Sequence, residues 1–111
     1  MITDYYTRVA IDAAERVWGI TLKDLRNRSD EELVLMRQIV VARLSENLNN
    51  RSVSEVIDRS ESTIETDIFN HQGMVEDGFE DYKKNNIEFI EAFEKIEDEL
   101  VNDALHDRHY C

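Results

Sequence analysis

The sequence predicts an all-α protein, and three observations support that fold class. Its 111 residues include no proline and only three glycines, so few positions oblige a helix to break. Apolar residues recur at intervals of three and four along most of the chain, which is the spacing of one helical face. Capping patterns precede several of these stretches. The length suits one helical domain, residues 1–111, with a single core.

The N-terminal part of the chain predicts a helix and then a short turn. Thr3 or Asp4 caps a helix that runs to about Trp18, and Gly19 ends it. The capping box TLKD, residues 21–24, opens a single helical turn.

Two further capping patterns predict the central helices. SDEE, residues 29–32, places Ser29 before the strongest apolar stripe of the chain, which continues to Leu48. The run NLNNRS then ends that helix, because Asn tolerates a left-handed C-cap. SVSE, residues 52–55, follows with Ser52 as the expected cap of a short helix.

The remaining sequence predicts a turn and two longer helices. Residues 58–60 form the turn, and ESTIETDIF, residues 61–69, begins the next helix. Gly73 and Gly78 each weaken this helix by about 1 kcal/mol relative to Ala, so we expect a break or kink there. A long acidic helix covers about residues 86–106. The side chains expected in the core of this half are Ile64, Ile68, Phe69, Val75, Phe79, Tyr82, Ile87, Ile90, Phe93, Leu100 and Val101, joined by Trp18.

The net charge of −12 is unevenly distributed and argues against general affinity for phosphate. Residues 20–60 hold seven basic and seven acidic side chains. Residues 61–111 hold four basic and 15 acidic side chains, a net charge of −11. A DNA-binding face is therefore expected only on the neutral middle of the chain.

Composition also indicates the compartment. The longest apolar run is four residues, Ile39–Ala42, too short to span a bilayer, and no secretory signal opens the chain. The single cysteine, Cys111, cannot form a disulfide framework. We expect a soluble, cytoplasmic protein with no membrane partner.

Residues 52–71 have the spacing of a helix-turn-helix. Val53 and Ile64 are eleven positions apart, Ile57 lies between them, and Asp58 occupies the turn position where a left-handed backbone is required. Two ordinary short helices that meet at a turn would give a similar pattern, and this alternative stays open.

The segments flanking this pattern carry a family resemblance. In order, they are VWGITLKDLRNRS, RQIVVARLSENL, RSVSEVI, RSESTI and NNIEFIEAFEKIEDEL, which fall between Val17 and Leu100. This stretch resembles the C-terminal DNA-binding domain of the bacterial replication initiator DnaA and related modules of phages and mobile elements. The resemblance implies an all-helical fold that binds duplex DNA, with a helix-turn-helix in the major groove and a basic loop at the minor groove.

The resemblance also implies positions for the DNA-binding residues. Arg26 and Arg28 match the basic loop, and Arg37 and Gln38 match an arginine–glutamine pair that faces the DNA backbone. We expect phosphate contacts from six cationic side chains: Lys23, Arg26, Arg28, Arg37, Arg51 and Arg59.

The recognition signature is matched only in part. Arg59 and Thr63 match its arginine and one threonine, whereas Ser60, Glu61 and Ser62 replace an aspartate, a histidine and a threonine. Arg59 can pair with guanine, and Glu61 can accept a hydrogen bond from cytosine but repels phosphates. Acidic residues one turn further along, Glu65 and Asp67, are expected to add to that repulsion.

The acidic C-terminal half suggests a second hypothesis. A helix-turn-helix scaffold could act as an acidic module that binds a basic protein or mimics DNA. The long acidic helix either docks on the rest of the chain or pairs with a second copy in a homodimer, and both arrangements would bury Phe89, Phe93 and Ile96.

No catalytic or cofactor motif accompanies these features. The sequence has no glycine-rich phosphate loop and no Ser/His/Asp set, so we expect neither an enzyme nor a cofactor. His106, His109 and Cys111 are too few for a structural zinc site, which needs four ligands, and are expected to belong to a frayed tail at residues 106–111. His71 is expected to be partly buried.

Overall fold

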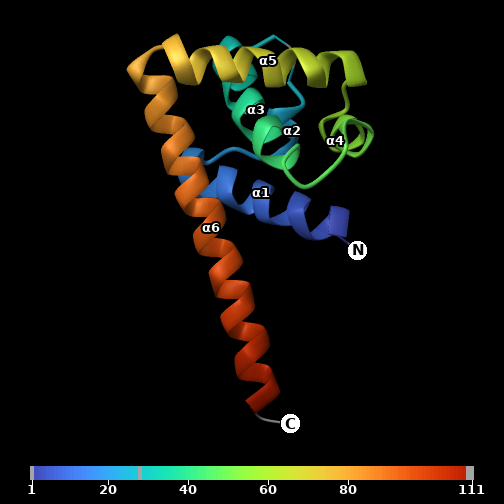
Figure 1. Cartoon of the computed structure of the whole chain (residues 1–111), viewed down its shortest axis with the longest axis vertical. Helices are drawn as coiled ribbons and strands as arrows, with labels where there is room; N and C mark the ends of the chain where they lie inside the picture. Colours follow the sequence, from blue (N-terminus) through green and yellow to red (C-terminus); the bar gives the residue numbers. More distant parts are fainter. Residues whose placement is uncertain (1, 28, 110–111) are drawn as a thin grey trace.

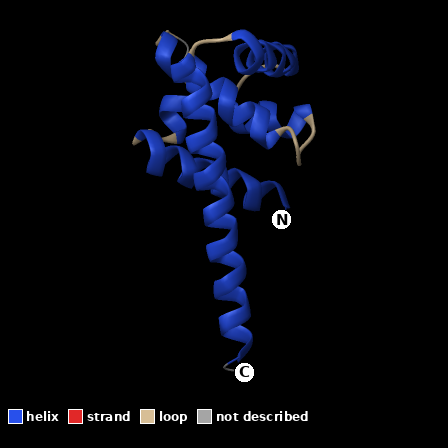
Figure 2. Ribbon diagram, turned by 60° about the vertical axis from the view of Figure 1, so that its left-hand side comes forward, coloured by secondary structure: helices blue, strands red, loops and turns tan. Residues whose placement is uncertain are grey.

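The all-α fold class is confirmed. The structure, a computed structural model, describes residues 2–27 and 29–109, with side chains described for residues 4–27 and 29–102. In these residues every regular element is an α-helix (Figure 2). The helices are α1 (Ile2–Trp18), α2 (Leu22–Leu25), α3 (Glu31–Leu44), α4 (Asn50–Ile57), α5 (Glu61–Asp77) and α6 (Glu80–His109).

The helices are arranged around α3. In Figure 1, α5 crosses the top of the molecule above α3, and α6 runs downward from the end of α5. α1 packs mainly on α6, while α3 and α4 pack on α5. The C-terminal part of α6 extends beyond the other helices in both views (Figures 1 and 2).

The core is a continuous cluster that joins α1, α3, α4, α5 and α6. The rings of Trp18 and Phe89 stack with centroids 5.2 Å apart and an angle of 8° between their planes. Phe89 and Phe93 are fully buried and Ile96 is buried beside them. Around these three residues the apolar face of α6 packs against helices of the same chain.

The three capping patterns predicted in the first half of the chain each lie at or near the start of a helix. One N-cap is the expected residue, and the other two are nearby residues. The TLKD capping box forms as expected around Thr21. Asp30 caps α3 in place of Ser29, because its carboxylate accepts hydrogen bonds from the backbone N–H groups of Glu32 and Leu33. Ser29 instead donates to the side chain of Asn27.

The cap of α4 is Asn49 and not Ser52. The Asn49 side-chain oxygen accepts a hydrogen bond from the backbone N–H of Ser52 at 2.8 Å, so α4 begins at Asn50. The expected end of the preceding helix within NLNNRS is also wrong, because α3 ends at Leu44 with Ser45 as its C-cap.

α5 continues without a break through Gly73 and ends at Asp77. The predicted interruption occurs only at Gly78, whose N–H donates to the carbonyl of Met74 at 2.9 Å. A Cβ atom at position 78 would collide with the backbone of Met74, so the corner between α5 and α6 needs glycine.

Several expected core positions are wrong. Phe69 and Phe79 are 74% and 79% exposed. The inward face of α5 follows Ile64, Ile68 and Met74, and Phe69 points about 100–140° away from each of them. Phe79 lies beyond the end of the helix. Three more residues of the expected stripes are also exposed: Val75, Ile87 and Val101. Tyr82 is buried as expected.

Candidate nucleic-acid interface

The expected recognition element consists of α4, a turn at Asp58 and α5. Asp58 adopts a left-handed backbone, with φ 59° and ψ 51°, and its N–H donates to the carbonyl of Ser54. Val53, Ile57 and Ile64 are fully buried on the two sides of the turn. The apolar spacing seen in the sequence thus brings the two helices together around one buried cluster.

Arg26 and Arg59 tie the loop after α2 to this turn. Nε of Arg26 donates to the carbonyl of Val56 at 3.0 Å, and Nη2 of Arg59 donates to the carbonyl of Arg26 at 2.6 Å. Nη1 of Arg59 also donates to the carbonyl of Asp58 at 2.8 Å. The two guanidinium groups therefore share one edge of the molecule.

Arg28 belongs to the same loop but lies outside the described residues. Its neighbours are held by Asn27, whose side-chain oxygen accepts hydrogen bonds from the backbone N–H groups of Ser29 and Asp30.

The expectation that Arg37 faces the DNA backbone is wrong. Its side chain is buried and forms two hydrogen bonds with Asp67, from Nε to Oδ2 at 2.9 Å and from Nη2 to Oδ1 at 3.0 Å. Both partners are less than a tenth exposed. Arg37 therefore neutralises a carboxylate inside the protein, and Asp67 does not repel phosphates at the surface.

Gln38 is also buried rather than turned toward solvent, with 7% of its surface exposed. Within the described residues, its Oε1 atom has no hydrogen-bond partner. Gln38 is thus removed from the expected set of backbone contacts, together with Arg37.

The first turn of α5 carries the remaining signature residues. Ser60 caps the helix by accepting a hydrogen bond from the backbone N–H of Thr63, and the two hydroxyl groups lie 3.0 Å apart. Glu61 and Ser62 are exposed. A shallow hollow beside this turn is lined by Val34, Arg37, Arg59, Ser60 and Thr63. Ser60 and Thr63 are partly engaged in capping, which leaves Glu61 and Ser62 as the outward side chains.

Of the other two expected cations, one is exposed on α2 and the other has a local partner. Lys23 is exposed on α2. Nε of Arg51 lies 3.7 Å from a carboxylate oxygen of Glu55 one turn further along α4, and both side chains are largely exposed. Pairs of this kind are weak, so Arg51 remains accessible to another anion.

Asp67 was expected at the surface, and its role as the buried partner of Arg37 was not predicted from the sequence. The signal was present, because Asp67 lies between Ile64 and Ile68 on the inward stripe of α5. A carboxylate on an apolar stripe requires a compensating group, and an arginine on the facing helix is the usual one.

Other kinds of site have little support in the described part of the chain. No group of three or more His, Cys, Asp or Glu side chains is positioned to hold a metal among the described residues. The histidines and cysteine of the tail lie outside the described side chains. None of the described helices is both long enough and apolar enough to cross a membrane.

Comparison with known proteins adds no relative. No family model matches the chain, and no curated protein or solved structure shows a significant match.

Proposed function

We propose that this chain is a DNA-binding module in which α4, the Asp58 turn and α5 act as a helix-turn-helix. The observation that carries the proposal is the link between Arg26 and Arg59. It positions a basic loop against the start of the recognition helix, so that both could reach a duplex at once. The sequence resemblance to initiator C-terminal domains supports the same assignment.

The proposed interface is weaker than the sequence suggested. With Arg37 paired internally, the described phosphate-binding candidates are Lys23, Arg26, Arg51 and Arg59. Four phosphate contacts correspond to a slope of log K against log salt of about −4. Glu61 stands at the outward face of the first turn, where it would favour cytosine and oppose non-specific binding.

The test is fluorescence anisotropy of two labelled duplexes, titrated with the protein at low and then moderate salt. One duplex has a random sequence and the other carries the binding site of bacterial initiator proteins, the initiator box. We expect a preference for the initiator box and a steep loss of affinity with salt. Arg59→Ala should abolish binding, while Arg59→Lys should retain part of it because the charge remains. Lys84→Ala is the matched control, because Lys84 is an exposed cation on α6 far along the chain from the proposed face. Absence of binding at low salt, or equal binding by the Arg59→Ala protein, would contradict the proposal.

A second candidate function is binding of a basic protein. The burial of Arg37 against Asp67 favours it, since this pair removes a cation from the proposed DNA face. The net charge of −11 beyond residue 60 favours it as well. Part of this acid is matched internally, because Nη2 of Arg43 lies 3.8 and 4.0 Å from carboxylate oxygens of Glu94 and Glu97.

This second function is tested by charge reversal on α6. A basic partner should be retained less well as salt is raised and should be lost when Glu91, Glu94, Glu97 and Asp98 are changed to Lys. Retention of the partner by that variant would rule out α6 as the binding face.

A further inference from the structure

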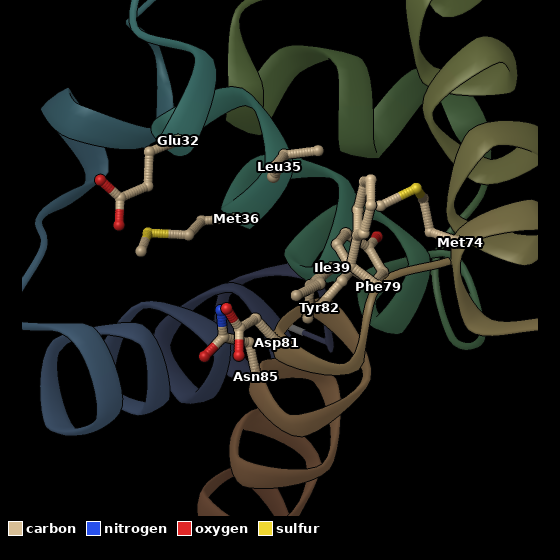
Figure 3. A pocket seen from close by; sticks show the side chains of 9 residues that line it. All are labelled: Glu32, Leu35, Met36, Ile39, Met74, Phe79, Asp81, Tyr82 and Asn85. Carbon is tan, nitrogen blue, oxygen red and sulfur yellow. The ribbon is translucent and has the colours of Figure 1, made fainter. Parts of the chain in front are cut away.

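An apolar groove lies at the corner where α5 gives way to α6, on the side that faces α3. It encloses about 270 Å³. Its walls come from three helices and the corner itself: Leu35, Met36 and Ile39 of α3, Met74 of α5, Phe79 at the corner, and Tyr82 of α6. Figure 3 shows the side chains of Phe79 and Met74 close together at one end of the groove and Glu32 at the other.

The groove continues along α5 into a second hollow. Leu35 and Met74 line both, and Phe69 and Gln38 line only the second. Phe69 and Phe79 are among the most exposed large apolar side chains of the described residues, and Leu35 is 39% exposed. A contiguous exposed patch with two phenylalanines is unusual on a protein with no apolar partner and typically marks an interaction site.

The rim of the groove is acidic. Glu32 and Asp81 line it directly. The segment from residue 76 to residue 81 around the corner contains four acidic residues and no basic one, and all four are exposed. This charge is complementary to a basic ligand. It also opposes a second copy of the chain, which would bring its own acidic rim and a net charge of −12.

We propose that this groove binds a short basic amphipathic segment of another protein. An apolar anchor side chain would enter between Phe79, Met74 and Leu35, and flanking Lys or Arg residues would face Glu32 and Asp81. Met36 and Met74 suit this role because flexible thioether side chains adapt to different anchors. The groove lies at the opposite end of α5 from the proposed DNA interface, so the two proposals are independent.

The test uses a fluorescein-labelled peptide of twelve residues, designed as an amphipathic helix with Leu and Phe on one face and Lys on the other. Two matched probes replace the Lys residues by Glu or the Leu and Phe residues by Ser. Anisotropy should show binding of the first peptide only, weaker at higher salt. Phe79→Ser and the double variant Glu32→Lys, Asp81→Lys should each weaken it at least tenfold.

The control variants are Val101→Ser and Glu15→Lys, which remove an exposed apolar side chain and reverse an exposed charge outside the groove. They should bind the first peptide like the original protein. Amide chemical-shift changes on peptide binding should include Leu35, Gln38 and Met74.

Four results would overturn the proposal: no binding of the first peptide, equal binding of the Ser-substituted probe, equal weakening by the control variants, or self-association in sedimentation that Phe79→Ser abolishes. The last would make a second copy the occupant. Duplex binding, measured on the same Phe79→Ser protein, should be unchanged, so that a failure of the groove and a failure of DNA binding are separable.

Discussion

Arg37 of α3 and Asp67 of α5 form a buried two-point ion pair, although they are 30 residues apart in the sequence. The planar guanidinium group matches both carboxylate oxygens, which fixes the rotation of α5 about its axis relative to α3. The direction in which Phe69 and the first turn of α5 face solvent follows from that rotation. The pair thus links the core to both proposed binding surfaces.

Replacing one partner of this pair should lower the free energy of unfolding more than replacing both. Arg37→Met leaves the Asp67 carboxylate buried without compensation and should lower the free energy of unfolding by about 3–5 kcal/mol. The double variant Arg37→Met, Asp67→Leu should recover most of that loss, because no uncompensated charge remains. Urea denaturation of the two variants and the original protein measures both values. A double variant no more stable than the single one would contradict this account.

Protonation of His71 should destabilise the fold in mildly acidic solution. Burial lowers the pKa of His71 below its ordinary value of 6.5, and a weaker influence of Glu46 acts in the opposite direction. Nδ1 of His71 lies 2.7 Å from the Tyr82 hydroxyl, whose pKa is raised by burial and by nearby Asp67. Because the folded-state pKa of the imidazole is the lower one, its contribution to stability is complete above pH 6.5 and declines as the pH falls below that value.

The measurement compares the pH dependence of unfolding for the original protein and His71→Asn between pH 7 and pH 5. The original protein should lose more stability over this interval than the variant, and the difference isolates the imidazole from the many carboxylates. Parallel curves for the two proteins would show that His71 titrates equally in the folded and unfolded states.

Truncation of an aromatic side chain should lower the free energy of unfolding strongly where the ring is buried and only slightly where it is exposed. Phe89→Ala removes a fully buried ring that stacks on Trp18 and should cost about 3–5 kcal/mol. Phe69→Ser and Phe79→Ser remove exposed rings and should change the free energy of unfolding by less than about 0.5 kcal/mol. Thermal and urea unfolding of the three variants check this. A large loss for either exposed position would mean that its ring packs in the protein's own core.

The turn at Asp58 should tolerate glycine and reject β-branched residues. Its φ of 59° is accessible to Gly and Asp, whereas Val in this conformation should cost about 1–2 kcal/mol. Asp58→Gly should leave the fold intact. Circular dichroism and urea denaturation of the two variants provide the measurement, and similar stabilities would show that the turn does not depend on a left-handed residue.

The sequence predicted the starts of three helices closely because their signals are local, whereas α6 begins at Glu80 and not at about residue 86. Capping boxes, apolar spacing and the Asp58 turn depend on neighbouring residues, and α2, α3 and α5 begin within about a residue of the expected places. The choice between Ser52 and Asn49 as a cap was missed because both side chains suit that role and tertiary packing decides between them.

The candidate site was harder to predict because it depends on contacts between distant residues. Whether an arginine is available to DNA depends on what lies opposite it, and neither Asp67 nor the Val56 carbonyl is close in sequence to its partner. The exposure of Phe79 has a similar origin, since it depends on the angle at which α6 leaves α5. A helical stripe indicates which residues share a face, and it does not show whether another element covers that face.

That angle depends on Gly78, where any side chain would collide with the backbone of Met74. Accommodating a larger residue at this corner would require the two helices to move apart. Phe79 and Tyr82 would then shift relative to Leu35, and the groove would change its width although none of its lining residues had changed. Ligand preference at this surface can therefore be altered by a substitution at a position that the ligand never touches.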